Sequence, residues 1–241
     1  MYQRAPSHLG CTLLNALAVS EPLIRGNWIN ALADTGWAVT HALVSPELAV
    51  QLRREAIDLH ENGYLSRAGV GRAEDHALLS SIRRDKTKWL SRESAVQAAY
   101  LDVMEEVRLA VNSSLFMGLF SYEAHFAAYE PGAFYKRHMD AFKGARNRVL
   151  SSVFYLNEDW LAEDGGALAI YADETSTEIA DVVVPELGTL VLFLSEDIPH
   201  EVLPANRDRY SIAGWFRVND RGVAPSLQVA LPTTPDLPDL N

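Results

Sequence analysis

The first half of the chain carries apolar residues at the three- and four-residue spacing of amphipathic helices. One apolar stripe, Leu48–Leu59, follows the helix-start signal Ser45-Pro46-Glu47 and stops before Gly63. A longer stripe covers Ser94–Leu115, and a shorter segment lies within residues 22–36. The pattern predicts three helices, each with one face buried against a core.

The second half of the chain changes to the two-residue alternation of β-strands. Turn residues such as Pro131-Gly132 and Asp164-Gly165-Gly166 separate the runs. Seven strands are predicted, over Glu123–Tyr129, Phe134–Asp140, Arg148–Leu156, Ala167–Ala172, Asp181–Val184, Thr189–Leu194 and Tyr210–Val218. Short strands at this spacing are typical of a barrel or jelly roll. Helices followed by strands indicate an α+β arrangement, with the helices supporting one face of a sheet.

The 241 residues divide into three expected parts. Residues 1–36 form an N-terminal helical extension, residues 37–222 the main folded domain, and residues 223–241 a Pro-rich flexible tail. Four prolines in the tail favour an extended conformation without a packed core.

Composition and charge exclude several classes of protein. Lys and Arg total 21 and Asp and Glu total 32, which gives a net charge of −11. This balance argues against nucleic-acid binding and against a polybasic membrane anchor, and no apolar run reaches the length of a membrane span. Cys11 is the single cysteine, so an intrachain disulfide and a CxxC metal cluster are excluded. A chain without disulfides suits the cytoplasm, and any metal site must use histidines and carboxylates.

A candidate metal site combines His138-Met139-Asp140, at the end of a predicted strand, with His200, which follows the turn residue Pro199. Side chains two residues apart on a strand point the same way, so His138 and Asp140 can converge. Two histidines and one carboxylate form the facial triad of non-haem Fe(II) oxygenases, which leaves three coordination positions open. The same residue types also suit zinc, and an H-x-D pair alone arises by chance in many chains.

Arg209 begins the last predicted strand and shares one face of it with Ser211 and Trp215. An arginine among small and apolar neighbours needs an anion, because burying an unpaired charge is very costly. Its planar guanidinium suits a carboxylate. The anion is either a small diacid that also binds the metal or a structural aspartate such as Asp208 or Asp220.

Several separate stretches carry a resemblance to a known family: Ile82–Trp89, Tyr129–Gly132, Tyr135–Asp140, Phe154–Trp160, Gly165–Leu168, His200–Val202, and Arg209-Tyr210 with Trp215. Together, over residues 35–220, they resemble the Fe(II)/2-oxoglutarate dioxygenases of the prolyl 4-hydroxylase superfamily. The hypoxia-inducible-factor-type prolyl hydroxylases and their bacterial relatives are especially similar. The resemblance implies a double-stranded β-helix core of the jelly-roll or cupin kind, with supporting N-terminal helices. It also implies Fe(II), 2-oxoglutarate and O2 as cofactors, with ascorbate as a reductant.

The resemblance also implies roles for individual residues. His138, Asp140 and His200 would hold Fe(II), while Arg209 would pair with the far carboxylate of 2-oxoglutarate. Tyr155 would hydrogen-bond the same carboxylate, and strand alternation allows it to project inward. Three further residues would line the cosubstrate pocket: Tyr129, Trp215 and Leu168.

At the substrate side, the resemblance implies an ion pair between Asp85 and Arg148, against the alternative of two unrelated surface charges. Residues Tyr64–Ser81 would form a loop that covers the substrate and moves when it binds. His125 and Arg84 depart from the family pattern. His125 is either a core histidine or a residue that tunes the pocket.

The implied reaction is hydroxylation of a prolyl residue in a protein or peptide, which gives 4-hydroxyproline, succinate and CO2. In bacterial relatives a translation elongation factor is one such substrate. The same chemistry on a free amino acid, a small molecule or another side chain is an alternative. A non-catalytic metal-binding sensor and a zinc hydrolase are others, although no HExxH motif is present. Neither a nucleic acid nor a membrane is expected as a partner.

Overall fold

The computed structural model describes residues 27–41, 43–67, 82–141 and 147–218. Most of its strands follow the helices, as predicted, but three short strands lie between them. Within these residues the three α-helices are α2 (Asn27–Thr35), α3 (Pro46–Glu61) and α5 (Ala95–Leu115). The strands are β1 (Trp37–Thr40), β2 (Ser66–Arg67), β3 (Lys86–Trp89), β4 (Leu119–Tyr129), β5 (Tyr135–His138), β6 (Arg148–Tyr155), β7 (Leu168–Tyr171), β8 (Ile179–Val183), β9 (Leu190–Leu194), β10 (His200–Val202) and β11 (Arg209–Val218). A short 3-10 helix, η2, covers Ala162–Asp164.

The two long predicted helices are confirmed, and serine caps fix where they start. The Ser45 hydroxyl accepts the backbone N–H of Leu48 at 3.2 Å, with Pro46 in the first position of α3. Ser94 caps α5 in the same way. The first predicted helix is observed from Asn27, because residues 1–26 lie outside the described part. No helix among the described residues is long and apolar enough to cross a membrane.

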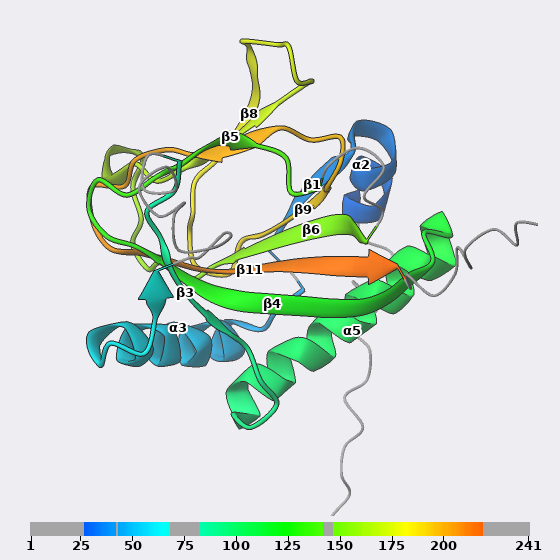
Figure 1. The fold of residues 1–241 in the computed structure, drawn as a ribbon. Coiled ribbons are helices and arrows are strands. Elements are labelled where there is room, and N and C mark those ends of the chain that lie inside the picture. The colour runs from blue at the N-terminus through cyan, green and yellow to red at the C-terminus, as the bar shows by residue number, and fades with distance from the viewer. Residues whose placement is uncertain (1–26, 42, 68–81, 142–146, 219–241) are drawn as a thin grey trace, which may run out of the picture.

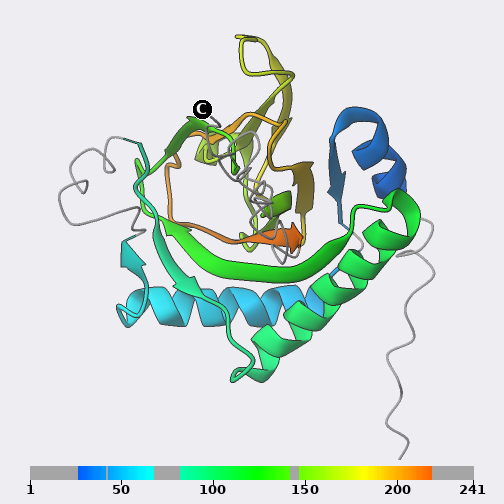
Figure 2. The same ribbon diagram turned by 45° about the vertical axis from the view of Figure 1, so that its right-hand side comes forward.

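The strands form two antiparallel sheets that face each other. The larger sheet has the order β1-β9-β6-β11-β4-β3-β2 and the smaller one the order β5-β10-β7-β8. Figure 1 shows α3 and α5 beneath β4 and β11 of the larger sheet, with β5 on the opposite side of that sheet. In the turned view the larger sheet curves around the space between the sheets (Figure 2). This confirms the predicted jelly-roll fold with supporting helices.

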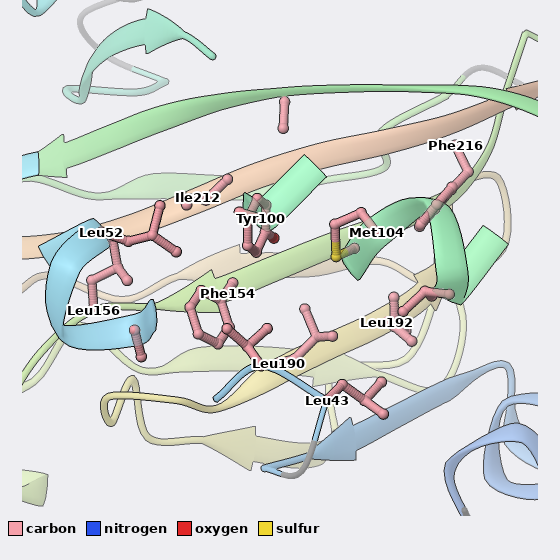
Figure 3. Close-up of a cluster of buried hydrophobic side chains, with 14 of the residues drawn as sticks. Leu43, Leu52, Tyr100, Met104, Phe154, Leu156, Leu190, Leu192, Ile212 and Phe216 are labelled. Carbon is pink, nitrogen blue, oxygen red and sulfur yellow. The ribbon is translucent and has the colours of Figure 1, made fainter. Parts of the chain in front are cut away.

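Strand alternation divides the larger sheet into a helix-facing core and a pocket-facing surface. On the helix side, Leu52 of α3 and Tyr100 and Met104 of α5 pack against Phe154 and Ile212 (Figure 3). α2 belongs to the same cluster through Trp28, Ile29 and Leu32. The intervening residues of β6, β9 and β11 point into the space between the sheets. The helices therefore cover the face of the larger sheet opposite the candidate site and stabilise that sheet.

All seven predicted strands are observed, but four short strands were missed. Three of them, β1, β2 and β10, have four residues or fewer, which is too short to show a period. The fourth, β3, reads as polar because it contains Lys86 and Lys88, yet it pairs with β4 through Lys86↔Ala128. The predicted strand ending at Asp140 instead ends at His138, and the chain bends beyond it.

Candidate metal centre and cosubstrate pocket

The metal-ligand candidates meet where two strands of the smaller sheet pair. His200, at the start of β10, lies opposite His138, the last residue of β5, and Asp140 follows in the bend. One potential ligand atom from each residue lies within 4.8 Å of the other two. The Asp140 Oδ1 atom is 3.5 Å from His138 Nε2 and 3.9 Å from His200 Nε2. Asp140 reaches this position although the observed strand β5 ends at His138, two residues before it.

Backbone carbonyls orient both imidazole rings. His138 Nδ1 lies 2.8 Å from the Lys136 carbonyl oxygen, and His200 Nδ1 lies 3.0 Å from that of Ile198. Because a carbonyl only accepts hydrogen bonds, each Nδ1 carries the proton and each Nε2 keeps its lone pair for a metal.

The protonation states also fit a metal. Burial opposes ionisation of Asp140, but the two imidazoles and the Ser151 hydroxyl outweigh it and hold the pKa of this carboxyl well below its usual range. Burial lowers the pKa of His200 to about 4. At neutral pH the site offers a carboxylate and a neutral imidazole, which are the forms that bind metals. The donor set of two nitrogens and one oxygen fits Fe(II).

A cavity of about 710 Å³ extends from these residues between the sheets. It is lined by the three candidate ligands and by most of the other predicted site residues: Tyr129, Leu168, Arg209, Trp215, Arg148 and Asp85. Tyr155 packs in a buried cluster with Tyr129 and Leu168. The structure thus brings the metal, cosubstrate and substrate candidates around one space.

Arg209 is buried in this space without an acidic partner among the described residues. Its side chain lies over the rings of Tyr129 and Tyr155, with the guanidinium carbon 4.9 and 5.0 Å from the two ring centroids. Nε donates to the Gly166 carbonyl at 2.7 Å, whereas Nη2 has no hydrogen-bond partner. An ion pair with Asp208 is not formed, and Asp220 lies outside the described residues. A buried, unpaired guanidinium is a receptor for an anion.

Tyr155 offers a second unpaired donor beside Arg209. Its side chain is fully buried, and its hydroxyl has no hydrogen-bond partner. Burial raises the pKa of Tyr155 to about 12, so the phenol stays protonated and can donate. The Arg209 Nη2 and the Tyr155 hydroxyl, two buried donors without hydrogen-bond partners, fit the distal carboxylate of 2-oxoglutarate.

Tyr155→Phe is expected to weaken 2-oxoglutarate binding by roughly 10- to 100-fold, because a hydrogen bond to a charged group contributes about 1.5–3 kcal/mol. Calorimetric titration of the metal-loaded protein with 2-oxoglutarate measures this. Tyr122→Phe is the matched control, since the Tyr122 hydroxyl is also buried but bonds Ser152 on the opposite face of the sheet. Equal affinities in the two variants would contradict the assigned role.

Gly166 holds Arg209 in place and is expected not to tolerate a side chain. Its φ is +65°, and an added Cβ would lie 2.9 Å from Arg209 Cδ. Gly166→Ala should therefore displace the guanidinium and weaken 2-oxoglutarate binding roughly tenfold. Gly63→Ala is the control, because Gly63 has φ +72° with nothing within 4 Å of the added atom. An unchanged affinity in Gly166→Ala would show that Arg209 can shift freely.

The predicted ion pair between Asp85 and Arg148 was wrong. Asp85 accepts two hydrogen bonds from Arg83, at 2.7 and 2.5 Å. Arg148 pairs with Glu123 at 3.1 Å and lies 3.9 Å from the ring centroid of Trp215. Arg83 is two residues from Asp85 and presents its planar fork to the carboxylate, so a nearby partner replaces the distant one. Both predicted residues still line the cavity.

His125 is buried, as a core histidine would be, and it lines the cavity. It lies between Trp89 and Trp215, with ring centroids 5.3 and 5.4 Å away. Its Nδ1 is 3.1 Å from the Phe126 carbonyl oxygen, and burial lowers its pKa. Sequence reasoning gave Trp89 no separate role, although half of its surface is exposed at the rim. The predicted covering loop lies mostly outside the described residues, which include only 64–67 of it.

This fold and site define a class. A jelly roll that carries two histidines and one carboxylate beside a pocket with a buried, unpaired arginine has the features of a non-haem iron oxygenase with an anionic cosubstrate.

Comparison with known proteins identifies the family. Residues 124–217 match the 2OG-Fe(II) oxygenase superfamily. A crystal structure of a Pseudomonas putida prolyl-4-hydroxylase is 38% identical with a TM-score of 0.69, and the match covers 80% of this chain and 97% of that one. The chain belongs to the 2OG-Fe(II) oxygenase superfamily, whose members use Fe(II), 2-oxoglutarate and O2.

Two further relatives are more distant. A prolyl hydroxylase from Trichoplax adhaerens, solved with a peptide fragment of the hypoxia inducible factor oxygen degradation domain, shares the fold. It is 24% identical with a TM-score of 0.69, over 79% of this chain and 87% of that one. The hypoxia-inducible factor prolyl hydroxylase of Caenorhabditis elegans is 24% identical over 220 residues, 86% of this chain. The chain spans only 30% of the length of that curated relative.

Proposed function

We propose that this protein is an Fe(II)- and 2-oxoglutarate-dependent hydroxylase of prolyl residues in a protein or peptide. The observation that carries this proposal is the buried, unpaired Arg209, which lines the same cavity as His138, Asp140 and His200. A metal site alone would also suit a zinc hydrolase, but such an enzyme gives no role to an unpaired arginine. The relatives named prolyl hydroxylases support the choice of substrate.

In the proposed mechanism the protein binds and orients the reactants and excludes water from them. His138, Asp140 and His200 would hold the metal through Nε2, Oδ1 and Nε2. Arg209 and Tyr155 would bind the distal carboxylate of 2-oxoglutarate. With both cosubstrates bound, Fe(II) supplies the chemistry that inserts one oxygen atom into a C–H bond and releases succinate and CO2. The apolar side chain of Leu168 and the ring of Tyr129 keep water from the cosubstrate.

Aromatic residues on the open side of the cavity suit a proline-containing peptide. Trp89 and Trp215 have ring centroids 6.3 Å apart, and Trp89 is 55% exposed. Proline-containing segments dock on aromatic-lined grooves because their extended conformation is already formed. A translation elongation factor is the first candidate substrate, ascorbate the candidate reductant and the cytoplasm the proposed compartment. The single cysteine supports that compartment.

The test is mass spectrometry of proline-containing peptides incubated with protein, Fe(II) and 2-oxoglutarate. A gain of one oxygen atom on proline, with stoichiometric succinate, is the expected result. A peptide with alanine in place of that proline is the control and should stay unmodified. Succinate formation that no prolyl peptide stimulates would favour a small-molecule substrate, and absence of succinate formation would favour a non-catalytic sensor.

A further inference from the structure

Two buried serines form a chain of hydrogen bonds that ends on the candidate metal ligand Asp140. Ser151, on the pocket face of β6, donates its hydroxyl proton to Asp140 Oδ2 at 2.6 Å. The Ser195 hydroxyl, just after β9, lies 2.9 Å from the Ser151 hydroxyl. Both serines are almost completely buried, at 1% and 0% exposure.

The direction of this chain follows from the number of protons. A serine hydroxyl has one proton to donate and lone pairs with which to accept. Because Ser151 uses its proton on Asp140, Ser195 must donate to Ser151. The order of donation is Ser195 to Ser151 to Asp140, and the bond to the carboxylate is short, as expected for an ionised acceptor.

We propose that Ser151 and Ser195 are positioning residues that turn Asp140 so that only its Oδ1 atom faces the metal. Since Oδ2 is held by Ser151, the carboxylate binds through one oxygen and leaves the remaining positions open for cosubstrates. This inference rests on the proposed metal centre. It assigns to β6, and to the residue that follows β9, a part of that centre that was not predicted for them.

Ser195 also holds the backbone around Asp140. Its carbonyl oxygen accepts the N–H of Ala141 at 3.1 Å, and its own N–H donates to the Val149 carbonyl at 3.0 Å. This second contact matters because Asp140 lies beyond the end of β5, where no strand ladder fixes the chain. One residue therefore stabilises both the backbone beside Asp140 and, through Ser151, its side chain.

Buried hydroxyl groups are unusual at the positions of Ser151 and Ser195. Burying a hydroxyl is unfavourable unless it is hydrogen-bonded, and the neighbouring inward residues Val153 and Phe193 are apolar. Partners in the outer shell of a metal site commonly change metal affinity by 10- to 100-fold when they are replaced. The serine pair is placed to have such an effect.

The test is titration of the metal-free protein with Co(II), read as the dissociation constant and the visible absorption spectrum of the bound ion. Ser151→Ala should bind Co(II) roughly 10- to 100-fold more weakly and with an altered spectrum, whereas Ser151→Thr should restore both. Ser195→Ala should have a smaller effect. The double variant should be no weaker than Ser151→Ala, because the Ser195 hydroxyl acts through Ser151.

Ser152→Ala is the matched control. Ser152 is the adjacent residue, equally buried, but its hydroxyl lies 2.9 Å from Tyr122 on the opposite face of the sheet. Its Co(II) affinity and spectrum should equal those of the wild type. If circular dichroism shows that Ser151→Ala is unfolded, Ser151→Thr is compared with Ser151→Val. These two variants differ only in that a methyl group of valine replaces the hydroxyl of threonine.

The outcomes separate the inference from the proposal on which it rests. A wild-type affinity and spectrum in Ser151→Ala, or in Ser151→Val, would overturn the positioning role, as would full additivity with Ser195→Ala. Failure of the wild-type protein to bind one Co(II) would instead overturn the metal centre itself.

Discussion

Asp140→Ala is expected to lose stoichiometric metal binding and to lower 2-oxoglutarate turnover by more than about 100-fold, which exceeds the usual effect of an outer-shell partner. Asp140 supplies the one charged ligand of the candidate centre, and its Oδ1 lies within 4 Å of Nε2 of both histidines. Two neutral imidazoles alone do not balance a divalent cation in a buried site. Metal content after dialysis and succinate release measure the two effects.

Asp102→Ala is a suitable control for that variant, because Asp102 is an exposed residue of α5 that pairs with Arg92 far from the cavity. It should keep both the metal and the turnover. If Asp140→Ala retained one tightly bound Fe(II) per chain, the assigned ligand set would be incorrect.

Residue type and spacing were enough to predict the ligand set, but not how Asp140 reaches it. The H-x-D spacing suggested a strand in which both side chains point the same way. The structure ends β5 at His138 and uses Ser151 and Ser195 to hold Asp140 in the bend. Contacts between residues 44 positions apart in sequence, such as these two serines, leave no periodic signal.

Pairings of charged residues were the least predictable feature. The resemblance implied that Asp85 meets Arg148, yet Arg83 and Glu123 take these places. The choice of partner among nearby charged side chains depends on the length of each side chain and on neighbouring aromatic rings. The ring of Trp215, for example, lies under the Arg148 guanidinium. By contrast, two-residue alternation predicted the inward face of β11 correctly, because one buried side of a strand fixes the whole register.

Alternation along β6 and β11 also explains how one sheet serves stability and chemistry together. Phe154 and Ile212 pack against the helices, while their chain neighbours Tyr155 and Ser211 face the cosubstrate space. A shift of either strand by one residue would exchange core and pocket. The helical layer that α3 and α5 build behind the sheet therefore helps to fix the register that puts Arg209 on the pocket face.

Arg209→Met is expected to weaken 2-oxoglutarate binding by at least about 100-fold, because removing one partner of a buried ion pair costs about 3–5 kcal/mol. Without cosubstrate, the thermal unfolding midpoint of the variant should be close to that of the wild type. Removing an unpaired buried charge stabilises the fold, and this offsets the loss of the hydrogen bond to the Gly166 carbonyl. Addition of 2-oxoglutarate should raise the midpoint of the wild type but not of the variant.

Arg207→Met is the control, as Arg207 pairs with Asp164 and stacks on Trp160 outside the cavity. A variant that still gained stability from 2-oxoglutarate would assign the cosubstrate carboxylate to another cation.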